Sequence, residues 1–289
     1  MMKRSLLKSI AIACLLYAPF TFSQNSDIDE TEKKPIKVGV KAGFSLGNLT
    51  DGNDNIYTKE YESKSGMDVG VQVTFSINDL ISIQTEINYT DRGGTRKGMQ
   101  PAPSDELSGM LNQFLPLIGM PLVTDQNPLY ADFDSEFDID YIEVPVLVQF
   151  GWGDDLRFHI EAGPYIGYML CATQKTMGNS EFYYDEAGTN EVVVPNPYFD
   201  PTNPANGPQF VPIGAQDLTA DTDITDDLRT INFGGIIGLG LSKNISDKSS
   251  LFLNARGSYG FTAIQFDETF GQSHIGGVVF SLGYAYALD

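Results

Sequence analysis

The chain has 289 residues, and 38 Asp and Glu against 18 Lys and Arg give a formal net charge of −20. This acidity argues against nucleic acid as a partner, because phosphate binding requires clustered Lys and Arg. After the N-terminal region, no segment has the roughly 18 consecutive apolar residues of a transmembrane helix.

The N-terminal region has the pattern of an export signal. Three basic residues precede the apolar stretch 10–18, and Thr21 and Ser23 are small residues placed as a cleavage site requires. The sequence therefore predicts a signal peptide at residues 1–23, followed by a short periplasmic tail at residues 24–35.

Cysteine usage is sparse. Cys14 lies inside the apolar stretch and leaves a lipoprotein signal as an alternative, although the apolar residues continue beyond it. After cleavage only Cys171 remains, so no intramolecular disulfide is expected, and this residue is interpreted as a small side chain at a strand end.

Residues 36–289 contain segments in which apolar and polar or small residues alternate, as in a β-strand with two different faces. In the last of them, Phe280, Leu282 and Tyr284 alternate with Ser281 and Gly283. The predicted strands are 36–46, 66–77, 80–90, 140–152, 156–170, 230–242, 250–261 and 275–288. The pattern predicts an all-β fold, an eight-stranded antiparallel up-and-down transmembrane β-barrel with long extracellular loops.

The connections between these strands alternate in length. The short ones are 78–79, 153–155 and 244–248, and the long ones are 47–65, 91–139, 172–229 and 262–274. Outer-membrane barrels have short periplasmic turns and long extracellular loops. The sequence therefore predicts an outer-membrane protein surrounded by lipid, with both mature termini near the periplasm.

Two prolines, Pro145 and Pro164, fall inside predicted strands. Proline removes a donor from the strand ladder and is normally confined to edges or bulges. Because a closed barrel has no edge, we expect local bulges at both positions.

The inward faces of the predicted strands carry charged side chains. The expected lumen network consists of Lys41, Glu86, Glu143, Arg157, His159, Glu161 and Arg256. In an eight-stranded barrel the interior is just wide enough for side chains to fill it, so these groups are expected to pair and close the lumen. The alternative is an ion or proton path, or an acid–base pair such as Glu143 with His159 or Glu161.

The loop 91–139 contains an expected helix, with Ser104 as its cap and Pro116 near its end. Its apolar residues include Leu107, Leu111 and Phe114. We expect this face to pack on the barrel rim, with the outer leaflet or a partner as alternatives.

The loop 172–229 is rich in aspartate. The carboxylates of Asp221, Asp223, Asp226 and Asp227 are close enough in the sequence to suggest that they bind Ca²⁺. The segment lacks the glycine and terminal glutamate of an EF-hand loop, so a solvated acidic loop is the expected interpretation, and no cofactor is expected.

The sequence contains no phosphate-binding loop and no zinc-ligand spacing. Ser273 and His274 lie in the last long loop, where a hydrolase could place a nucleophile and a base. Neighbouring residues rarely present both side chains to one substrate, so we expect no enzymatic activity and no catalytic residues.

Several stretches resemble the PorT-like outer-membrane β-barrel family of Bacteroidota. They are residues 38–45, 141–147 with Glu-Val-Pro, 159–167 with Ala-Gly-Pro, and the final Gly-Tyr-Ala-Tyr at 283–286. The resemblance implies an eight-stranded outer-membrane barrel, and the founding member of that family takes part in protein secretion. It implies no catalytic residues.

Together these observations predict an integral outer-membrane protein that acts as a structural or accessory component of an outer-membrane complex. Protein partners are expected to contact the extracellular loops, and the resemblance implies a secretion-related complex. A narrow porin or small-solute channel is the first alternative, and an outer-membrane hydrolase is the second.

Overall fold

The computed structural model describes residues 35–102, 105–203, 205, 207–267 and 269–288. The predicted signal peptide, residues 1–23, and the tail up to residue 34 lie outside the described residues. So does Ser104, the expected helix cap.

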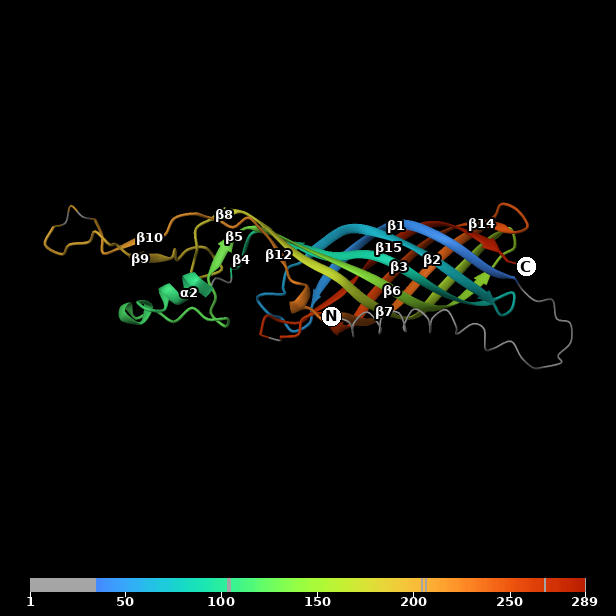
Figure 1. Ribbon diagram of the computed structural model, residues 1–289, viewed down its shortest axis with the longest axis horizontal. Coiled ribbons are helices and arrows are strands. Elements are labelled where there is room, and N and C mark those ends of the chain that lie inside the picture. The colour runs from blue at the N-terminus through green and yellow to red at the C-terminus, as the bar shows by residue number, and fades with distance from the viewer. Residues whose placement is uncertain (1–34, 103–104, 204, 206, 268, 289) are drawn as a thin grey trace, which may run out of the picture. The chain divides into compact units, whose positions relative to one another are not determined.

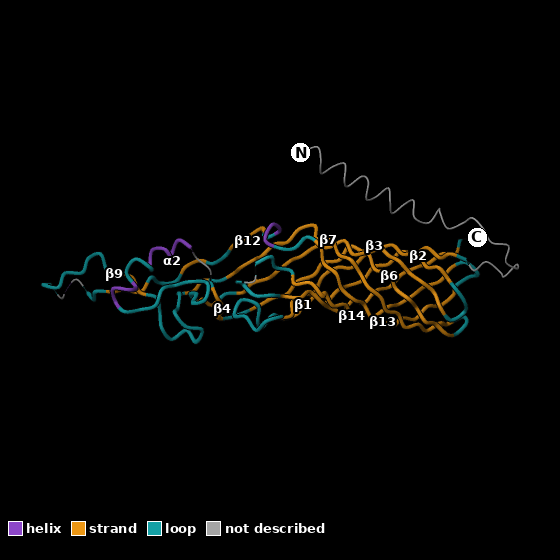
Figure 2. The backbone as a smooth tube through the Cα atoms, turned by 90° about the horizontal axis from the view of Figure 1, so that it is seen from below, coloured by secondary structure: helices purple, strands orange, loops and turns teal. Residues whose placement is uncertain are grey.

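Eight long antiparallel strands form a closed barrel (Figures 1 and 2). They are β1 (Ile36–Asp51), β2 (Glu62–Ser76), β3 (Ile81–Arg96), β6 (Asp134–Trp152), β7 (Leu156–Met177), β13 (Ile231–Asn244), β14 (Ser249–Ala263) and β15 (Ser273–Ala287). Each strand pairs with its neighbour in chain order, and β1 also pairs with β15. The predicted fold class is therefore confirmed.

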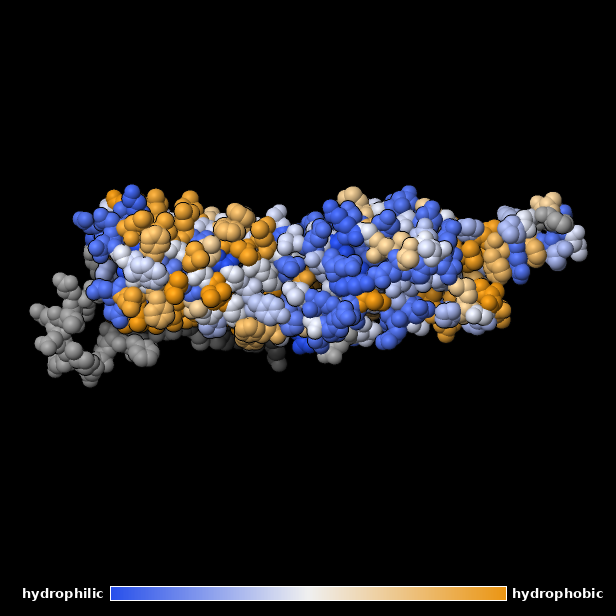
Figure 3. Space-filling view, turned by 180° about the vertical axis from the view of Figure 1, so that it is seen from behind, coloured by the Kyte–Doolittle hydropathy of each residue, from blue (hydrophilic) through white to orange (hydrophobic). Residues whose placement is uncertain are grey.

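The two faces of the barrel wall differ as the alternation predicts. Large apolar side chains such as Val40, Phe44 and Phe280 point outward and are exposed, while their neighbours Lys41 and Ser281 are buried inside. Figure 3 shows the resulting largely hydrophobic outer wall. In the parts of the chain that the structure describes, the helices are too short or too polar to cross a bilayer.

The barrel has two different ends. The turn end carries three short connections, 77–80, 153–155 and 245–248, and the loop end carries the four long ones. On the outer face near the loop end, Lys64 lies 3.0 Å from Asp91 and also contacts Asp138, which lies 2.5 Å from Lys175. This row of charges crosses four neighbouring strands and marks where the apolar wall ends.

Most strands are longer than predicted at the loop end, and three of them extend furthest. β3 continues to Arg96, β6 begins at Asp134 and β7 continues to Met177, with Arg96 opposite Ser135 and Asp134 opposite Met177. Polar residues on the outward face, such as Asp138 and Lys175, hid these extensions, because a strand outside lipid does not need an apolar outer face. The extension of β7 also pairs with β12 (Ala220–Asp223).

The expected bulges at Pro145 and Pro164 are not present. The pairing of β6 with β3 and β7 skips residues near these prolines but resumes in the same register, and Thr85 donates a hydrogen bond to the Pro145 carbonyl at 3.1 Å. The register shifts lie at Ser63/Asp68, Asp140/Tyr141 and Tyr259/Ala263. Missing ladder bonds are therefore tolerated without inserting a residue.

The projecting strands carry a head, which we define as residues 98–133 and 178–218 apart from 103, 104, 204 and 206. Its elements are β4 (Met99–Pro101), α2 (Asp105–Leu111), a 3₁₀ turn (Leu115–Ile118), β5 (Tyr130–Asp132), β8 (Asn179–Ser180), β9 (Val193–Pro195), β10 (Phe210–Pro212) and β11 (Gln216–Asp217). The pairings β4–β5, β8–β11 and β9–β10 hold it together.

The head has its own hydrophobic core. Leu111 and Leu115 pack with Leu129 and Phe133 from the same loop and with Phe182 and Val192 from the other large loop. The helix therefore ends at Leu111 and packs inside the head, which corrects the expectation that it covers the barrel rim. Burial between the two loops removes more apolar surface from water than contact with the polar rim would.

The seam between β1 and β15 should tolerate no side chain at Gly43. A Cβ there would lie 2.0 Å from the Phe280 carbonyl oxygen and 2.7 Å from Ser281 Cα, both of which are backbone atoms. Gly43→Ala should therefore cost about 1–3 kcal/mol of unfolding free energy, measured by urea titration in detergent.

Gly257→Ala is the matched control, because a Cβ at Gly257 meets no atom closer than 4.0 Å. Equal unfolding midpoints for the two variants would show that the seam is looser than described.

Candidate functional site

The barrel lumen contains a charged cluster centred on Glu86 of β3. Arg256 of β14 donates two hydrogen bonds of 2.8 Å to the Glu86 carboxylate, and its Nε donates to Glu161 of β7. Lys41 Nζ of β1 lies 3.0 Å from Glu86 Oε2 and 3.2 Å from Asp68 Oδ1. All five side chains are buried, so the cluster joins strands from opposite sides of the barrel.

Amide side chains on both sides of Glu86 complete this cluster. Gln149 Nε2 donates to Glu161 Oε2 at 2.8 Å and to Gln84 Oε1 at 2.9 Å. Asn88 Nδ2 donates to Glu86 Oε2 at 2.9 Å. These bonds satisfy carboxylate lone pairs that would otherwise be costly to remove from water.

A second ion pair lies nearer the loop end. Arg92 contacts Glu143 through Nε and Nη2 at 3.1–3.3 Å, and both side chains are buried. Arg92 is absent from the predicted network because the strand was expected to end at residue 90. Continued alternation through Thr90 and Arg92 is the signal that could have identified it.

Two residues of the expected network lie at its margin. His159 Nε2 is 3.9 Å from Glu161 Oε2, beyond hydrogen-bond distance. Arg157 lies at the turn end, where its Nη2 donates to the Asp79 carbonyl at 2.7 Å. Of the predicted residues, Lys41, Glu86, Glu161 and Arg256 are therefore brought together, Glu143 pairs with Arg92, and Arg157 does not join them.

Above the second ion pair, a group of apolar side chains closes the lumen at the loop end. We call it the plug; its buried members are Leu49, Ile139, Tyr141, Met169, Ala172, Leu228, Ile264 and Ile275. These residues come from β1, β6, β7 and β15 and from two of the loops. The plug and the charged cluster thus lie one above the other inside the barrel.

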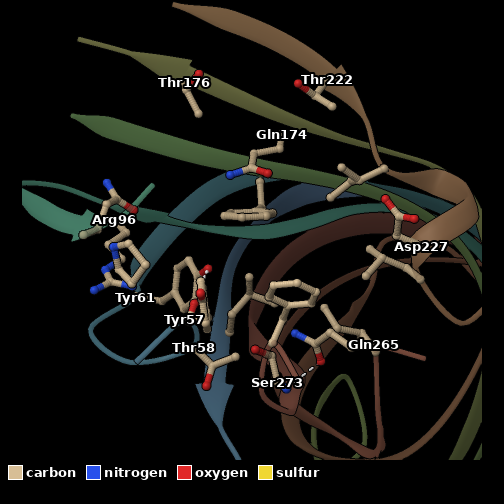
Figure 4. A pocket seen from close by; sticks show the side chains of 18 of the residues that line it. Tyr57, Thr58, Tyr61, Arg96, Gln174, Thr176, Thr222, Asp227, Gln265 and Ser273 are labelled. Atoms are coloured by element: carbon tan, nitrogen blue, oxygen red, sulfur yellow. Dashed lines mark hydrogen bonds between the residues drawn. The ribbon is translucent and has the colours of Figure 1, made fainter. Parts of the chain in front are cut away.

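Between the plug and the base of the head lies a cavity of about 790 Å³, which we call the loop-end chamber (Figure 4). All four long connections contribute to its lining. The wall includes the aromatic side chains of Tyr57, Tyr61, Phe133, Phe137, Phe266 and Phe270. Sequence reasoning missed this chamber because its lining residues are far apart in the chain.

The candidate calcium ligands do not form a common site. Asp221 and Asp223 lie on β12, where Asp223 Oδ1 accepts a hydrogen bond from the Thr225 backbone, while Asp226 and Asp227 lie in the following 3₁₀ turn (Thr225–Asp227). Within the described ranges, no three His, Cys, Asp or Glu side chains are grouped as a metal site requires. Calcium binding stays a prediction to which this geometry adds no support.

Ser273 and His274 do not form a nucleophile–base pair. Ser273 is buried, whereas the His274 ring stacks on Tyr259 and its Nδ1 lies 3.0 Å from the Gly260 carbonyl. The two residues are consecutive in β15, so their side chains point to opposite faces of the wall. The hydrolase alternative therefore gains no geometric support from them.

Comparison with solved structures finds outer-membrane and surface proteins of low sequence identity. Neisserial surface protein A has 11% identity and a TM-score of 0.37 over 87% of this chain and 97% of that chain. Ail, the attachment invasion locus protein of Yersinia pestis, has 11% identity and a TM-score of 0.36 over 87% and 98%. OprG from Pseudomonas aeruginosa has 8% identity and a TM-score of 0.38 over 90% and 99%.

No curated protein is significantly similar to the chain. A family model, in contrast, matches residues 22–265 and is described as the outer membrane protein beta-barrel domain. The matched range includes seven of the eight barrel strands.

Arg256 should contribute much more to stability than Arg157. Arg256→Met leaves Glu161 without its guanidinium and Glu86 with only Lys41, so it should lower the unfolding free energy by about 3–5 kcal/mol in a dry lumen. Urea titration of the folded protein in detergent measures this effect.

Arg157→Met is the control and should change stability by no more than about 0.5 kcal/mol, since the hydrogen bond that Arg157 donates to the Asp79 carbonyl is exposed. A similar small loss in both variants would mean that water, not Arg256, solvates the lumen carboxylates.

Proposed function

The chain belongs to the family of the outer membrane protein beta-barrel domain, and from this premise we propose that it is a non-catalytic anchor for a protein-binding head. In this proposal the barrel holds the protein in the outer membrane, and the head contacts other components of an outer-membrane complex. The pairing of buried charges across the lumen, with the plug above them, is the observation that supports the proposal.

A path for ions or solutes would have to cross both the charged cluster and the plug. The Glu86–Arg256 pair is bidentate and buried, and Tyr141 and Ile139 above it are almost fully buried. Opening this path requires separating buried opposite charges, which costs several kcal/mol. A narrow porin is therefore the weaker candidate function.

The head offers a contact surface to a partner. Its core holds the fold of the two loops, yet Leu117 is 83% exposed and Met110 and Leu122 are also exposed on the same segment. Tyr198 and Phe199 add exposed aromatic rings on the other loop. Exposed apolar residues on the surface of a folded unit are typical of protein interaction sites.

The resemblance to PorT-like barrels favours a complex that takes part in protein secretion. The arrangement of short and long connections supports an orientation with the head outside the cell and both termini near the periplasm.

Wild-type protein reconstituted in a planar lipid bilayer should show negligible conductance, because paired side chains and the plug fill the bore. Stable single-channel currents, with a selectivity that changes in Arg256→Met, would support the porin instead.

An epitope inserted between Pro201 and Thr202 of the head should be labelled by antibody on intact cells. The same epitope inserted between Asp154 and Asp155, in a turn-end connection, should be labelled only after permeabilisation. The reverse result would invert the proposed orientation.

The partner interaction can be tested by native electrophoresis of gently solubilised membranes. The wild type should migrate in a complex whose other components mass spectrometry identifies, and Leu117→Asp with Leu122→Asp should release them. Leu253→Asn, on the lipid-facing wall, controls for a general polar substitution. If the head variant and the wild type migrate identically, this surface does not mediate assembly.

A further inference from the structure

The loop-end chamber contains a buried positive charge without a carboxylate partner. Arg96, at the end of β3, is only 2% exposed, and its Nη1 donates to the Ile56 carbonyl at 2.9 Å. Its Nη2 is buried and has no hydrogen-bond partner among the described residues. No described Asp or Glu lies within ion-pair distance of it, unlike Arg92 and Arg256 in the lumen.

Such a charge is unusual, because a buried guanidinium is normally paired with an anion. The tyrosines around Arg96 do not supply that anion. Burial raises the pKa of Tyr61 to about 12 even with the Arg96 guanidinium nearby, and burial also raises the pKa of Tyr57 to about 12. Both phenols are therefore neutral at physiological pH.

The rest of the chamber suits an apolar body. Tyr61 packs edge-on against Phe137 with ring centroids 5.4 Å apart, and Tyr57 packs edge-on against Phe270 at 5.2 Å. These contacts hold aromatic walls in place on two sides. Ser273 also lines the chamber, and its hydroxyl is buried without a hydrogen-bond partner among the described residues.

We propose that the loop-end chamber binds a small organic monoanion, a carboxylate carried on an aromatic or aliphatic body, with Arg96 as its counter-ion. The volume of about 790 Å³ lies within the range of about 300–1,000 Å³ that is typical of small-molecule sites. This site is independent of the proposed partner interaction of the head.

The acidic residues at the chamber restrict the ligand further. Asp226, Asp227 and Asp267 line it but are exposed to solvent, and Figure 4 shows Asp227 on the side opposite Arg96. They repel a second negative charge on a ligand that already reaches Arg96. The chamber should therefore bind a monocarboxylate and reject molecules with several negative charges.

The test uses the folded protein in lipid nanodiscs and isothermal titration calorimetry, with empty nanodiscs subtracted. The probes are 4-phenylbutyrate, the neutral 4-phenylbutanol and the dianion phenylsuccinate. The wild type should bind 4-phenylbutyrate saturably and at least about tenfold more tightly than either comparison compound, as a charge-assisted bond predicts. Arg96→Gln should remove this preference and leave binding of the alcohol unchanged.

Arg229→Gln is the matched control, since Arg229 lies at the same end of the barrel but stacks over Phe266 and does not line the chamber. It should leave the carboxylate affinity unchanged. If Arg96→Gln does not fold, Leu218→Trp provides a second variant, because it fills the chamber and should weaken both the carboxylate and the alcohol. Binding that does not exceed empty nanodiscs, or that is equal for acid and alcohol in the wild type, would overturn the proposal.

Discussion

Closure of the β-sheet is the constraint on which the rest of this structure depends. In lipid, every backbone N–H and C=O must find a partner within the protein, and the pairing of β1 with β15 from Lys37 to Asp51 removes the last sheet edge. With eight strands the enclosed bore is only as wide as its side chains. The lumen charges must therefore compensate one another, which Glu86 and Arg256 do through two parallel hydrogen bonds.

The loop end carries the features on which both proposals depend. β3, β6 and β7 continue beyond the apolar wall and hold the head by backbone pairing rather than by flexible linkers. The same extensions place Arg96 and Phe137 beside the first and last loops, where the chamber forms. The extension of these strands beyond the apolar wall thus supports both the proposed contact surface and the proposed ligand site.

Local pattern was sufficient to predict the barrel. Alternation in segments such as 36–46 and 275–288 indicated the strands and their inward faces, and the lengths of the connections indicated two different ends. The side chains of Lys41, Glu86, Glu161 and Arg256 were predicted to point inward for the same reason, and the structure places them within one cluster. Alternation works here because lipid outside and a crowded bore inside impose opposite demands on successive residues.

The tertiary structure alone decided which charges pair and what the loops form. Arg92, not Arg157, forms the second buried ion pair of the lumen, because the strand continues past the end of its apolar pattern. In the core of the head Leu111 packs in the same cluster as Val192, and in the chamber Tyr57 packs against Phe270. These residues are far apart in the chain, so no local sequence pattern could predict the contacts. The sequence by itself determined the wall, because each wall residue faces either lipid or the lumen and its polarity follows from that side. The pairing of buried charges and the packing of distant loops depend on where closure brings the strands, and no single segment carries that information.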